Sequence, residues 1–269
     1  MQRDDPPSRT ADINPPLVAV IIPAHNAAAT ILEALDSAIT QTEKRLQIIV
    51  VDDGSTDQTR ELVTNIQQSD KRVQLLSQHN QGVSAARNSG LKVVQARYVA
   101  FLDADDKWLP NKLEIQLTFM QSTGATFTFT AYRKFSTQRL YRQRDVPQVA
   151  TYNTLLVSRP INTSSVVFDT TALTLNWPEL PRQSGLHEDL LLWLRLSKTT
   201  MLYGIKDDLC RVRIGRESRS SNKAKSALNV WRIYRTHEHL TFVRASTVFV
   251  RYAFNALLSY EPLRPNKLS

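Results

Sequence analysis

Short apolar runs alternate with helical patterns along the first part of the chain. Four mostly apolar runs lie at residues 17–22, 46–51, 73–76 and 98–102. Such runs are typical of strands that are buried on both faces of a parallel sheet. Between the first two runs, Ile31, Leu35 and Ile39 recur at helical spacing. Alternating strands and helices predict right-handed crossovers and a doubly wound, mostly parallel α/β sheet, with a Rossmann-like ligand crevice beyond the carboxyl ends of its strands.

The helix boundaries are also predicted from local signals. Ser55 and Gln58 have the spacing of a capping box for a second helix. Residues 83–96 form a helical pattern, and Pro110 is predicted in the first turn of a further helix that runs through Met120. These signals give each of the first four strands a following helix.

The remainder of the chain is less regular. Strands are predicted at 126–130, 164–168 and 209–214, and helices at 188–198 and 225–259. The first 16 residues contain four prolines and predict a flexible arm. We therefore expect a main domain over 17–215, with a regular half at 17–120 and a less regular half at 121–215. Residues 216–269 are expected to form a basic helical extension.

The charge of the chain is confined to its last part. The formal net charge is +9, and residues 211–269 hold 12 Lys and Arg against 3 Asp and Glu. A basic, aromatic-rich helix suits an anionic membrane surface, and packing of its apolar face on the main domain is the alternative. Nucleic-acid binding is disfavoured because the first 210 residues are neutral and their strand ends are acidic.

The cellular location is predicted from what the composition lacks. The single cysteine, Cys210, cannot form an intrachain disulfide, which fits a reducing compartment. The sequence has no apolar stretch of about 20 residues and no secretory leader pattern at its start. We expect a cytoplasmic protein that is peripheral on the inner face of the membrane.

Polar residues that could bind a ligand or take part in catalysis follow the predicted strands. Pro23, Ala24, His25 and Asn26 follow the first, and Asp52 and Asp53 end the second. Asp103, Asp105 and Asp106 follow the fourth, and three crowded carboxylates destabilise a strand end unless a cation compensates them. Mg²⁺ or Mn²⁺ takes one or two carboxylates and completes its shell with phosphate oxygens and water. A divalent metal is therefore predicted here, and the alternative is an acidic first turn of the helix that begins near Pro110.

Five motifs together resemble glycosyltransferase family 2 in their order and spacing. They are Val20-Ile21-Ile22-Pro23-Ala24-His25-Asn26, Val50-Val51-Asp52-Asp53-Gly54-Ser55-Thr56-Asp57, Asn80-Gln81-Gly82-Val83-Ser84-Ala85-Ala86-Arg87-Asn88, Phe101-Leu102-Asp103-Ala104-Asp105-Asp106, and Glu188-Asp189 with Trp193-Leu194-Arg195. The resemblance is dense over 17–115 and thinner over 186–198. It implies that 17–215 is a catalytic domain of GT-A fold, with a nucleotide-sugar-binding half at 17–120 and an acceptor half at 121–215. It also implies inverting transfer of a sugar from a nucleoside diphosphate donor, usually uridine-based.

The resemblance also implies roles for individual residues. Asp105 is expected to bind the metal with Asp103, and Asp189 stands at the position of the general base. His25 is expected to stack on the nucleoside base and Asp53 to accept a hydrogen bond from it. The donor contacts implied are Pro23, Ala24, His25, Asn26, Asp53, Arg87, Asp103 and Ala104. The expected acceptor is a saccharide or lipid-linked saccharide in cell-surface polysaccharide or lipopolysaccharide synthesis.

Departures from the family pattern leave alternatives open. His25 stands where many members have Tyr, and the chain lacks the Gln-x-x-Arg-Trp motif of processive synthases, so one sugar per encounter is predicted. A sugar nucleotidyltransferase would need a Gly-rich basic loop after the first strand. A dehydrogenase would need Gly-x-Gly-x-x-Gly there, and neither is present. A catalytically silent module that binds nucleotide sugars remains possible on the sequence alone.

Overall fold

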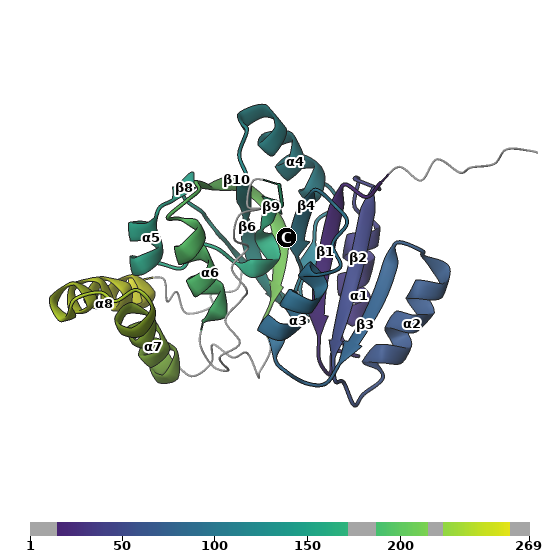
Figure 1. Cartoon of the computed structure of the whole chain (residues 1–269), viewed down its shortest axis with the longest axis horizontal. Coiled ribbons are helices and arrows are strands. Elements are labelled where there is room, and N and C mark those ends of the chain that lie inside the picture. The colour runs from purple at the N-terminus through teal and green to yellow at the C-terminus, as the bar shows by residue number, and fades with distance from the viewer. Residues whose placement is uncertain (1–14, 172–186, 215–222, 259–269) are drawn as a thin grey trace, which may run out of the picture.

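A mixed ten-stranded sheet organises the residues that the computed structural model describes, which are 15–171, 187–214 and 223–258. The strands are β1 (Val18–Ala24), β2 (Leu46–Asp53), β3 (Val73–Gln78), β4 (Tyr98–Phe101), β5 (Lys107–Trp108), β6 (Phe127–Ser136), β7 (Arg139–Arg144), β8 (Val149–Ala150), β9 (Val167–Asp169) and β10 (Leu202–Arg213). The α-helices are α1 (Ile31–Ile39), α2 (Thr59–Ser69), α3 (Val83–Leu91), α4 (Lys112–Thr123), α5 (Tyr152–Val157), α6 (Glu188–Leu196), α7 (Lys223–Arg232) and α8 (Phe242–Leu258). Figure 1 shows the sheet between flanking helices, with α7 and α8 at the far end from α2.

The first four strands pair in parallel in the order β3-β2-β1-β4. Strand β1 lies between β2 and β4, so the direction of strand succession reverses there. In open α/β sheets this switch point holds the ligand crevice, outside the carboxyl ends of the strands. The predicted doubly wound arrangement is confirmed in this half.

The second half of the sheet is mixed. Strand β9 is antiparallel to both β4 and β6 and lies between them, whereas β10 runs parallel to β6. The short strand β5 follows the acidic residues at the end of β4 and pairs antiparallel with β10. That pairing ties the acidic loop to the second half of the sheet.

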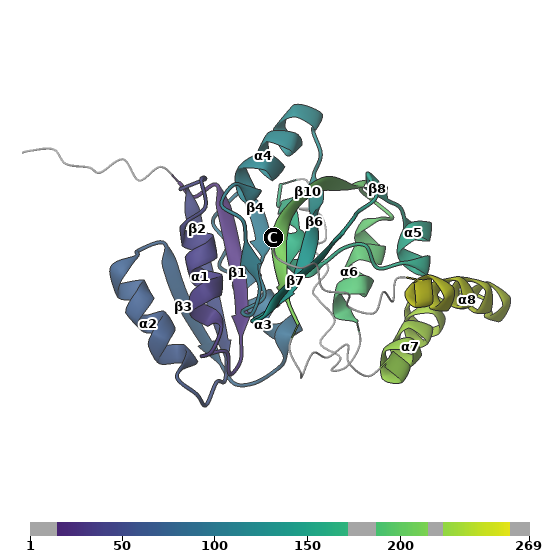
Figure 2. The ribbon, with the colours of Figure 1, turned by 180° about the vertical axis from the view of Figure 1, so that it is seen from behind.

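Each face of the sheet carries its own apolar core, because successive strand residues point to opposite faces. On β1, Ile21 packs in one cluster with residues of α3 and α6, whereas Val20 and Ile22 pack in the other with residues of α1, α2 and α4. All seven residues of β1 are buried. The view from behind shows α1 and α2 over that second face (Figure 2). This double burial explains why the strand sequences are continuously apolar.

Three predicted helix boundaries were wrong. Helix α2 begins at Thr59, and Asp57 rather than Ser55 accepts from the Thr59 backbone N–H at 3.0 Å. Pro110 precedes α4, which begins at Lys112, and α3 ends at Leu91 rather than at residue 96. Ser55 is instead used across the loop, where its hydroxyl accepts from the Asn26 N–H.

Two strands predicted in the second half of the domain and the predicted C-terminal helix also differ from the structure. The strand expected at 164–168 is a 3-10 turn, Thr163–Ser165, followed by β9, and β10 begins at Leu202, before the predicted 209. The long C-terminal helix is interrupted: α7 passes into a π-helical turn at Ile233–His237, and His239 has φ 51° before α8 begins. Of the predicted arm, residues 1–14 lie outside the described residues.

Candidate active site

The loops after β1 and β2 are joined to each other at the switch point. The Asn26 side-chain oxygen accepts from the Thr56 N–H at 2.8 Å, and His25 Nδ1 lies 2.8 Å from the carbonyl oxygen of Asp53. Gly54 has φ 73°, and a Cβ there would lie 2.8 Å from the backbone nitrogen of Asn80. Only glycine therefore allows the loop after β2 to approach the loop after β3 this closely. The exposed His25 ring is held at the rim of both loops.

Asp53 is buried and anchors the loop that follows β3. One carboxylate oxygen accepts from the Gln78 side chain at 2.7 Å and from the Gln81 N–H at 2.9 Å, and the other accepts from the Gly82 N–H at 2.8 Å. No local sequence signal predicted these contacts of Asp53 with Gln78, Gln81 and Gly82. The carboxylate thus shapes the wall of the crevice. A contact from Asp53 to a nucleoside base stays a prediction.

Pro23, Ala24 and Ala104 line the strand ends with small or rigid side chains. All three are buried, and Ala24 pairs with Asp52 at the end of the β1–β2 ladder. Their side chains offer no polar group to a ligand, so any donor contact from them would use the backbone. Their predicted place at the strand ends agrees with the structure.

Arg87 lies beneath the crevice and pairs with Asp103. The Arg87 side chain is 4% exposed, and its guanidinium lies 2.6 Å from Asp103 Oδ1 and over the Phe101 ring. Burial lowers the pKa of Arg87, but the carboxylates of Asp103, Glu188 and Asp189 outweigh it and hold that pKa above its usual value. Arg87 on α3 is therefore the positive charge shared by the end of β4 and the start of α6.

The two remaining carboxylates after β4 have different surroundings. Asp106 is buried, accepts from Ser164 Oγ at 2.6 Å and from the Arg213 N–H at 2.9 Å, and burial together with Asp103 and Asp105 raises its pKa. Asp105 is exposed. Asp106 thus fastens this loop to β10, a role that the sequence did not predict.

Asp103 and Asp105 suit a hard divalent cation. Carboxylate oxygens are the ligands that Mg²⁺ and Mn²⁺ accept, and one or two suffice when a diphosphate supplies further oxygens. Within residues 15–171, 187–214 and 223–258, no group of three or more His, Cys, Asp or Glu side chains could enclose a metal by itself. Asp103 and Asp105 offer two carboxylates to a cation whose remaining ligands would come from a diphosphate and water.

Helix α6 holds Asp189 in a rigid position in its first turn. Leu190, Leu191 and Leu192 are buried, and the Trp193 ring packs edge-on against Phe127 with centroids 5.2 Å apart. Burial raises the pKa of Asp189, but the positive charge of Arg159, with contributions from His187 and Arg87, brings it below its usual value. Asp189 is therefore ionised at neutral pH.

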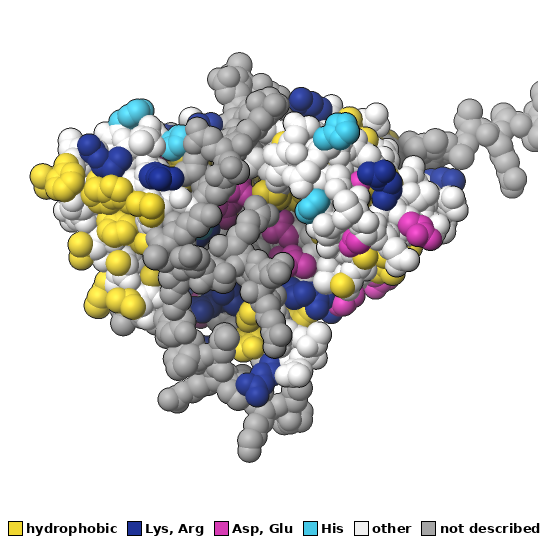
Figure 3. All heavy atoms as spheres, turned by 90° about the horizontal axis from the view of Figure 1, so that it is seen from below, with side chains coloured by type: hydrophobic (Ala, Val, Ile, Leu, Met, Phe, Trp, Pro, Cys, Tyr) yellow, Lys and Arg dark blue, Asp and Glu magenta, His cyan; other side chains and the backbone are white. Residues whose placement is uncertain are grey.

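Arg159 is a member of the site that sequence reasoning missed. Its guanidinium lies 3.4 and 3.5 Å from the two Asp189 oxygens and 3.4 Å from His187 Nε2. It follows α5 in the stretch that resembles no motif, so no local signal marked it. Seen from below, acidic side chains gather near the middle of the molecule with Lys and Arg side chains beside them (Figure 3).

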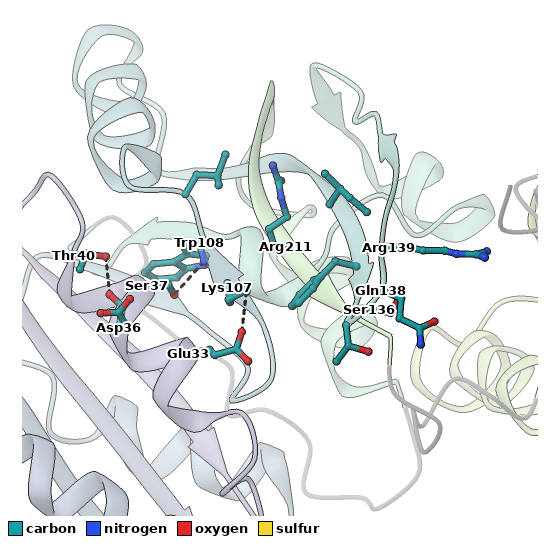
Figure 4. A pocket seen from close by; sticks show the side chains of 14 residues that line it. Glu33, Asp36, Ser37, Thr40, Lys107, Trp108, Ser136, Gln138, Arg139 and Arg211 are labelled. Carbon is teal, nitrogen blue, oxygen red and sulfur yellow. Dashed lines mark hydrogen bonds and ion pairs between the residues drawn. The ribbon is translucent and has the colours of Figure 1, made fainter. Parts of the chain in front are cut away.

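A separate cavity of about 610 Å³ lies between α1 and the β6–β7 hairpin (Figure 4). Its lining includes Lys107 and Trp108, but none of the predicted site residues. The Lys107 ammonium and the Arg213 guanidinium both lie over the Phe135 ring, at 4.8 and 4.5 Å from its centroid. Because the aromatic rings there are already covered or buried, this cavity offers no stacking surface for a nucleoside base.

Comparison with known proteins identifies relatives over most of the chain. A family model described as glycosyl transferase family 2 matches residues 19–174. TuaG of Bacillus subtilis, provisionally named a teichuronic acid biosynthesis glycosyltransferase, is 36% identical over 247 residues, which are 90% of this chain and 96% of TuaG. WfgD of Escherichia coli, a UDP-Glc:α-D-GlcNAc-diphosphoundecaprenol β-1,3-glucosyltransferase, is 35% identical over 219 residues, which are 80% of this chain and 84% of WfgD.

The fold has a close counterpart among solved structures. S. aureus TarS 1–349 in complex with UDP-GlcNAc superposes with a TM-score of 0.71 at 19% identity, and the match covers 91% of this chain and 73% of that one. The chain spans 44% of the longer crystallised TarS. At this identity the likeness bears on the fold alone. It agrees with the predicted GT-A type of α/β fold.

Proposed function

The chain belongs to glycosyltransferase family 2, and from this premise we propose that it transfers one sugar from a nucleoside diphosphate donor, with inversion, to an acceptor hydroxyl. The observation that supports this most is that the buried Arg87 pairs with Asp103 at 2.6 Å and also interacts electrostatically with Glu188 and Asp189 at the start of α6. The carboxylates that suit a donor diphosphate and the ionised Asp189 are therefore coupled through one buried cation. We assign the donor to the side of Asp103 and the acceptor to the side of Asp189.

Asp189 is proposed to act as the general base. An alcohol is a poor nucleophile until it loses its proton, and an ionised carboxylate on rigid α6 can accept that proton as the bond to the anomeric carbon forms. Attack from the side opposite the leaving diphosphate gives a single displacement and inversion. When bound on Asp105 and Asp103, a divalent cation supplies Lewis-acid stabilisation of the leaving group's charge.

We propose that the nucleoside binds at the loops after β1, β2 and β3. His25 at the rim provides an exposed ring for stacking, and the buried Asp53 orders the backbone of Gln81 and Gly82 against which a base would lie. The side-chain oxygen of Asn26 accepts from the Thr56 N–H, so Asn26 joins the loops after β1 and β2 beside His25. The donor is proposed to be uridine-linked, which is supported by WfgD, whose name gives UDP-Glc as its donor.

The acceptor is proposed to be a saccharide joined through a diphosphate to a polyprenol. WfgD acts on such a lipid-linked saccharide, and TuaG is named for a cell-surface polysaccharide. The enzyme would then work in cell-surface polysaccharide assembly at the cytoplasmic face of the membrane. Among the described helices, none is long and apolar enough to span a bilayer.

Helix α8 is the proposed contact with an anionic membrane surface. Five apolar side chains on this helix are between 60% and 75% exposed, namely Phe242, Val243, Val250, Phe254 and Leu257. Arg244 and Arg251 are exposed about 100° further around the helix, and 242–258 contains no Asp or Glu. Figure 3 shows apolar side chains gathered at this end of the molecule, on the face that carries the central acidic ones. An apolar stripe flanked by arginines is typical of helices that lie in a lipid interface.

The membrane contact predicts salt-sensitive binding to vesicles. The protein is expected to sediment with phosphatidylglycerol-containing vesicles at low salt, and less at 1 M salt, where the Debye length is about 3 Å. The double variant Val250→Asn, Phe254→Asn should lower the bound fraction about tenfold or more, since each side chain loses its burial in lipid. Leu32→Asn, at a 42% exposed apolar residue of α1, is the matched control. Equal sedimentation of the double variant and wild type would rule out α8 as the contact.

The proposed reaction is tested first on the donor alone. Purified protein is expected to release one nucleoside diphosphate slowly from a panel of UDP, GDP and dTDP sugars in Mn²⁺ or Mg²⁺, and not in chelator. The released nucleotide identifies the donor. If no nucleotide sugar is bound or hydrolysed with either metal, the proposed reaction is wrong.

A further inference from the structure

Arg159 extends from the end of α5 to the base Asp189 and to the C-terminal helix. Its guanidinium reaches the Asp189 carboxylate from one side, and it also hydrogen-bonds to the side chain of Tyr252 on α8. Burial lowers the pKa of Arg159, but Asp189 and Tyr252 outweigh it and hold that pKa above its usual value. The side chain is still 30% exposed. The positively charged guanidinium of Arg159 therefore lies beside the base, on the acceptor side of the site.

The contacts of Arg159 are long where those of Arg87 are short. Arg159 lies 3.4 to 3.5 Å from Asp189 and His187, whereas Arg87 lies 2.6 Å from Asp103. Charge-assisted hydrogen bonds are commonly about 2.7–2.9 Å. Arg159 is thus held near the base without a close ion pair, in a geometry that a further anion could tighten.

The acceptor chemistry identifies that anion. WfgD acts on GlcNAc-diphosphoundecaprenol, in which the reacting hydroxyl and the glycosyl phosphate are on one sugar. With an acceptor of this kind, the phosphate would lie one pyranose ring away from the hydroxyl at Asp189. Arg87 is engaged with Asp103 on the donor side, whereas Arg159 is beside the base on the acceptor side. A guanidinium can bind a phosphate through two parallel hydrogen bonds.

We propose that Arg159 binds the diphosphate of the acceptor and so selects lipid-linked saccharides over free ones. This inference rests on the proposed function, because it takes the acceptor hydroxyl to lie at Asp189. Tyr252, on the inner side of α8, links Arg159 to the helix whose outer side carries the exposed apolar stripe. The phosphate would then bind next to the element that meets the lipid surface.

The proposal is tested by binding of farnesyl diphosphate to protein saturated with UDP and Mg²⁺, so that the donor site is filled. Wild type is expected to bind it, and Arg159→Gln to bind it about 10- to 100-fold more weakly. The affinity of Arg159→Lys should be intermediate, because lysine keeps the positive charge but cannot form two parallel hydrogen bonds to one phosphate. Arg139→Gln, an exposed arginine of β7, is the matched control and should leave the affinity unchanged.

Other outcomes separate this proposal from a purely structural role and from the proposed function. If Arg159→Gln lowers sugar transfer but binds farnesyl diphosphate as wild type does, Arg159 only positions Asp189 and the proposal is wrong. Absence of binding to wild type, or equal affinity for farnesol, also overturns it. Donor hydrolysis in the same variants reports on the proposed reaction independently, because water needs no acceptor phosphate.

Discussion

Replacing Asp189 by asparagine is expected to lower sugar transfer to acceptor by about 10²–10⁴-fold, because the amide cannot accept the hydroxyl proton. Affinity for the nucleotide sugar should change little, since Asp189 lies on α6 and the donor is assigned to the strand ends. The measurement is steady-state transfer with the lipid-linked acceptor, beside calorimetric titration of the donor. This separates loss of the base from loss of the donor site.

The control for this substitution is Asp36→Asn, the same chemical change at an exposed position on α1. It should transfer sugar as wild type does. Thermal unfolding of both variants checks that the fold is kept, because removing the carboxylate also leaves Arg159 with one partner fewer. Transfer by Asp189→Asn within tenfold of wild type would remove Asp189 from the role of base.

The pH dependence follows from the lowered pKa of Asp189. Because the positive charge of Arg159, with a contribution from His187, outweighs burial and holds that pKa below its usual value, the carboxylate is ionised through the neutral range, and kcat/KM should fall only as the pH drops through the lowered pKa. The contact between Asp189 and Arg159 contributes stability above the pKa of an unfolded Asp, and this contribution is lost as the pH falls through the lowered pKa of the folded protein. An acid limb near pH 6 would indicate a different base.

Replacing Asp105 by asparagine is expected to lower metal-dependent donor hydrolysis by about 10²-fold or more. The reason is that an amide oxygen carries no charge and a divalent cation shared with the diphosphate would lose one of its two protein carboxylates. Asp103 is not an equivalent replacement, because one of its oxygens is 2.6 Å from the Arg87 guanidinium. Release of nucleoside diphosphate as a function of Mn²⁺ concentration measures the effect.

The dependence of hydrolysis on Mn²⁺ concentration tests whether Asp105 binds the metal. The Asp105→Asn enzyme should need a higher Mn²⁺ concentration for half-maximal hydrolysis, whereas Asp36→Asn should follow the wild-type curve. If Asp105→Asn and wild type respond identically to Mn²⁺ and to chelator, Asp105 does not hold the metal.

Much of the nucleotide-binding half could be predicted because its signals are local. A strand buried on both faces is apolar at most positions, so β1, β2 and β4 were visible as mostly apolar runs, with Gln47 the polar exception inside the run of β2. Turn residues and carboxylates directly after those runs located the strand ends. The capping of α2 was mispredicted because Ser55 and Asp57 are both good caps and only the fold of the loop chooses between them.

The contacts within the site could not be predicted, since they join residues far apart in the chain. Arg87 reaches Asp103, Asp53 holds the loop after β3, and Ser164 and Arg213 hold Asp106. Arg159 had no motif to mark it, and its role follows only from the packing of α5 beside α6 and α8.

The sequence by itself located most of the strands and helices, though not β5, β7, β8 and α5, and it showed where the acidic strand ends lie and that the last part of the chain is basic. Tertiary structure decided the order β3-β2-β1-β4, the insertion of antiparallel β9, the partners of Arg87 and Arg159, and which side of α8 is exposed. The physical reason is that side-chain period and hydrophobicity act over a few residues. Strand order and ion-pair choice depend instead on how whole elements pack.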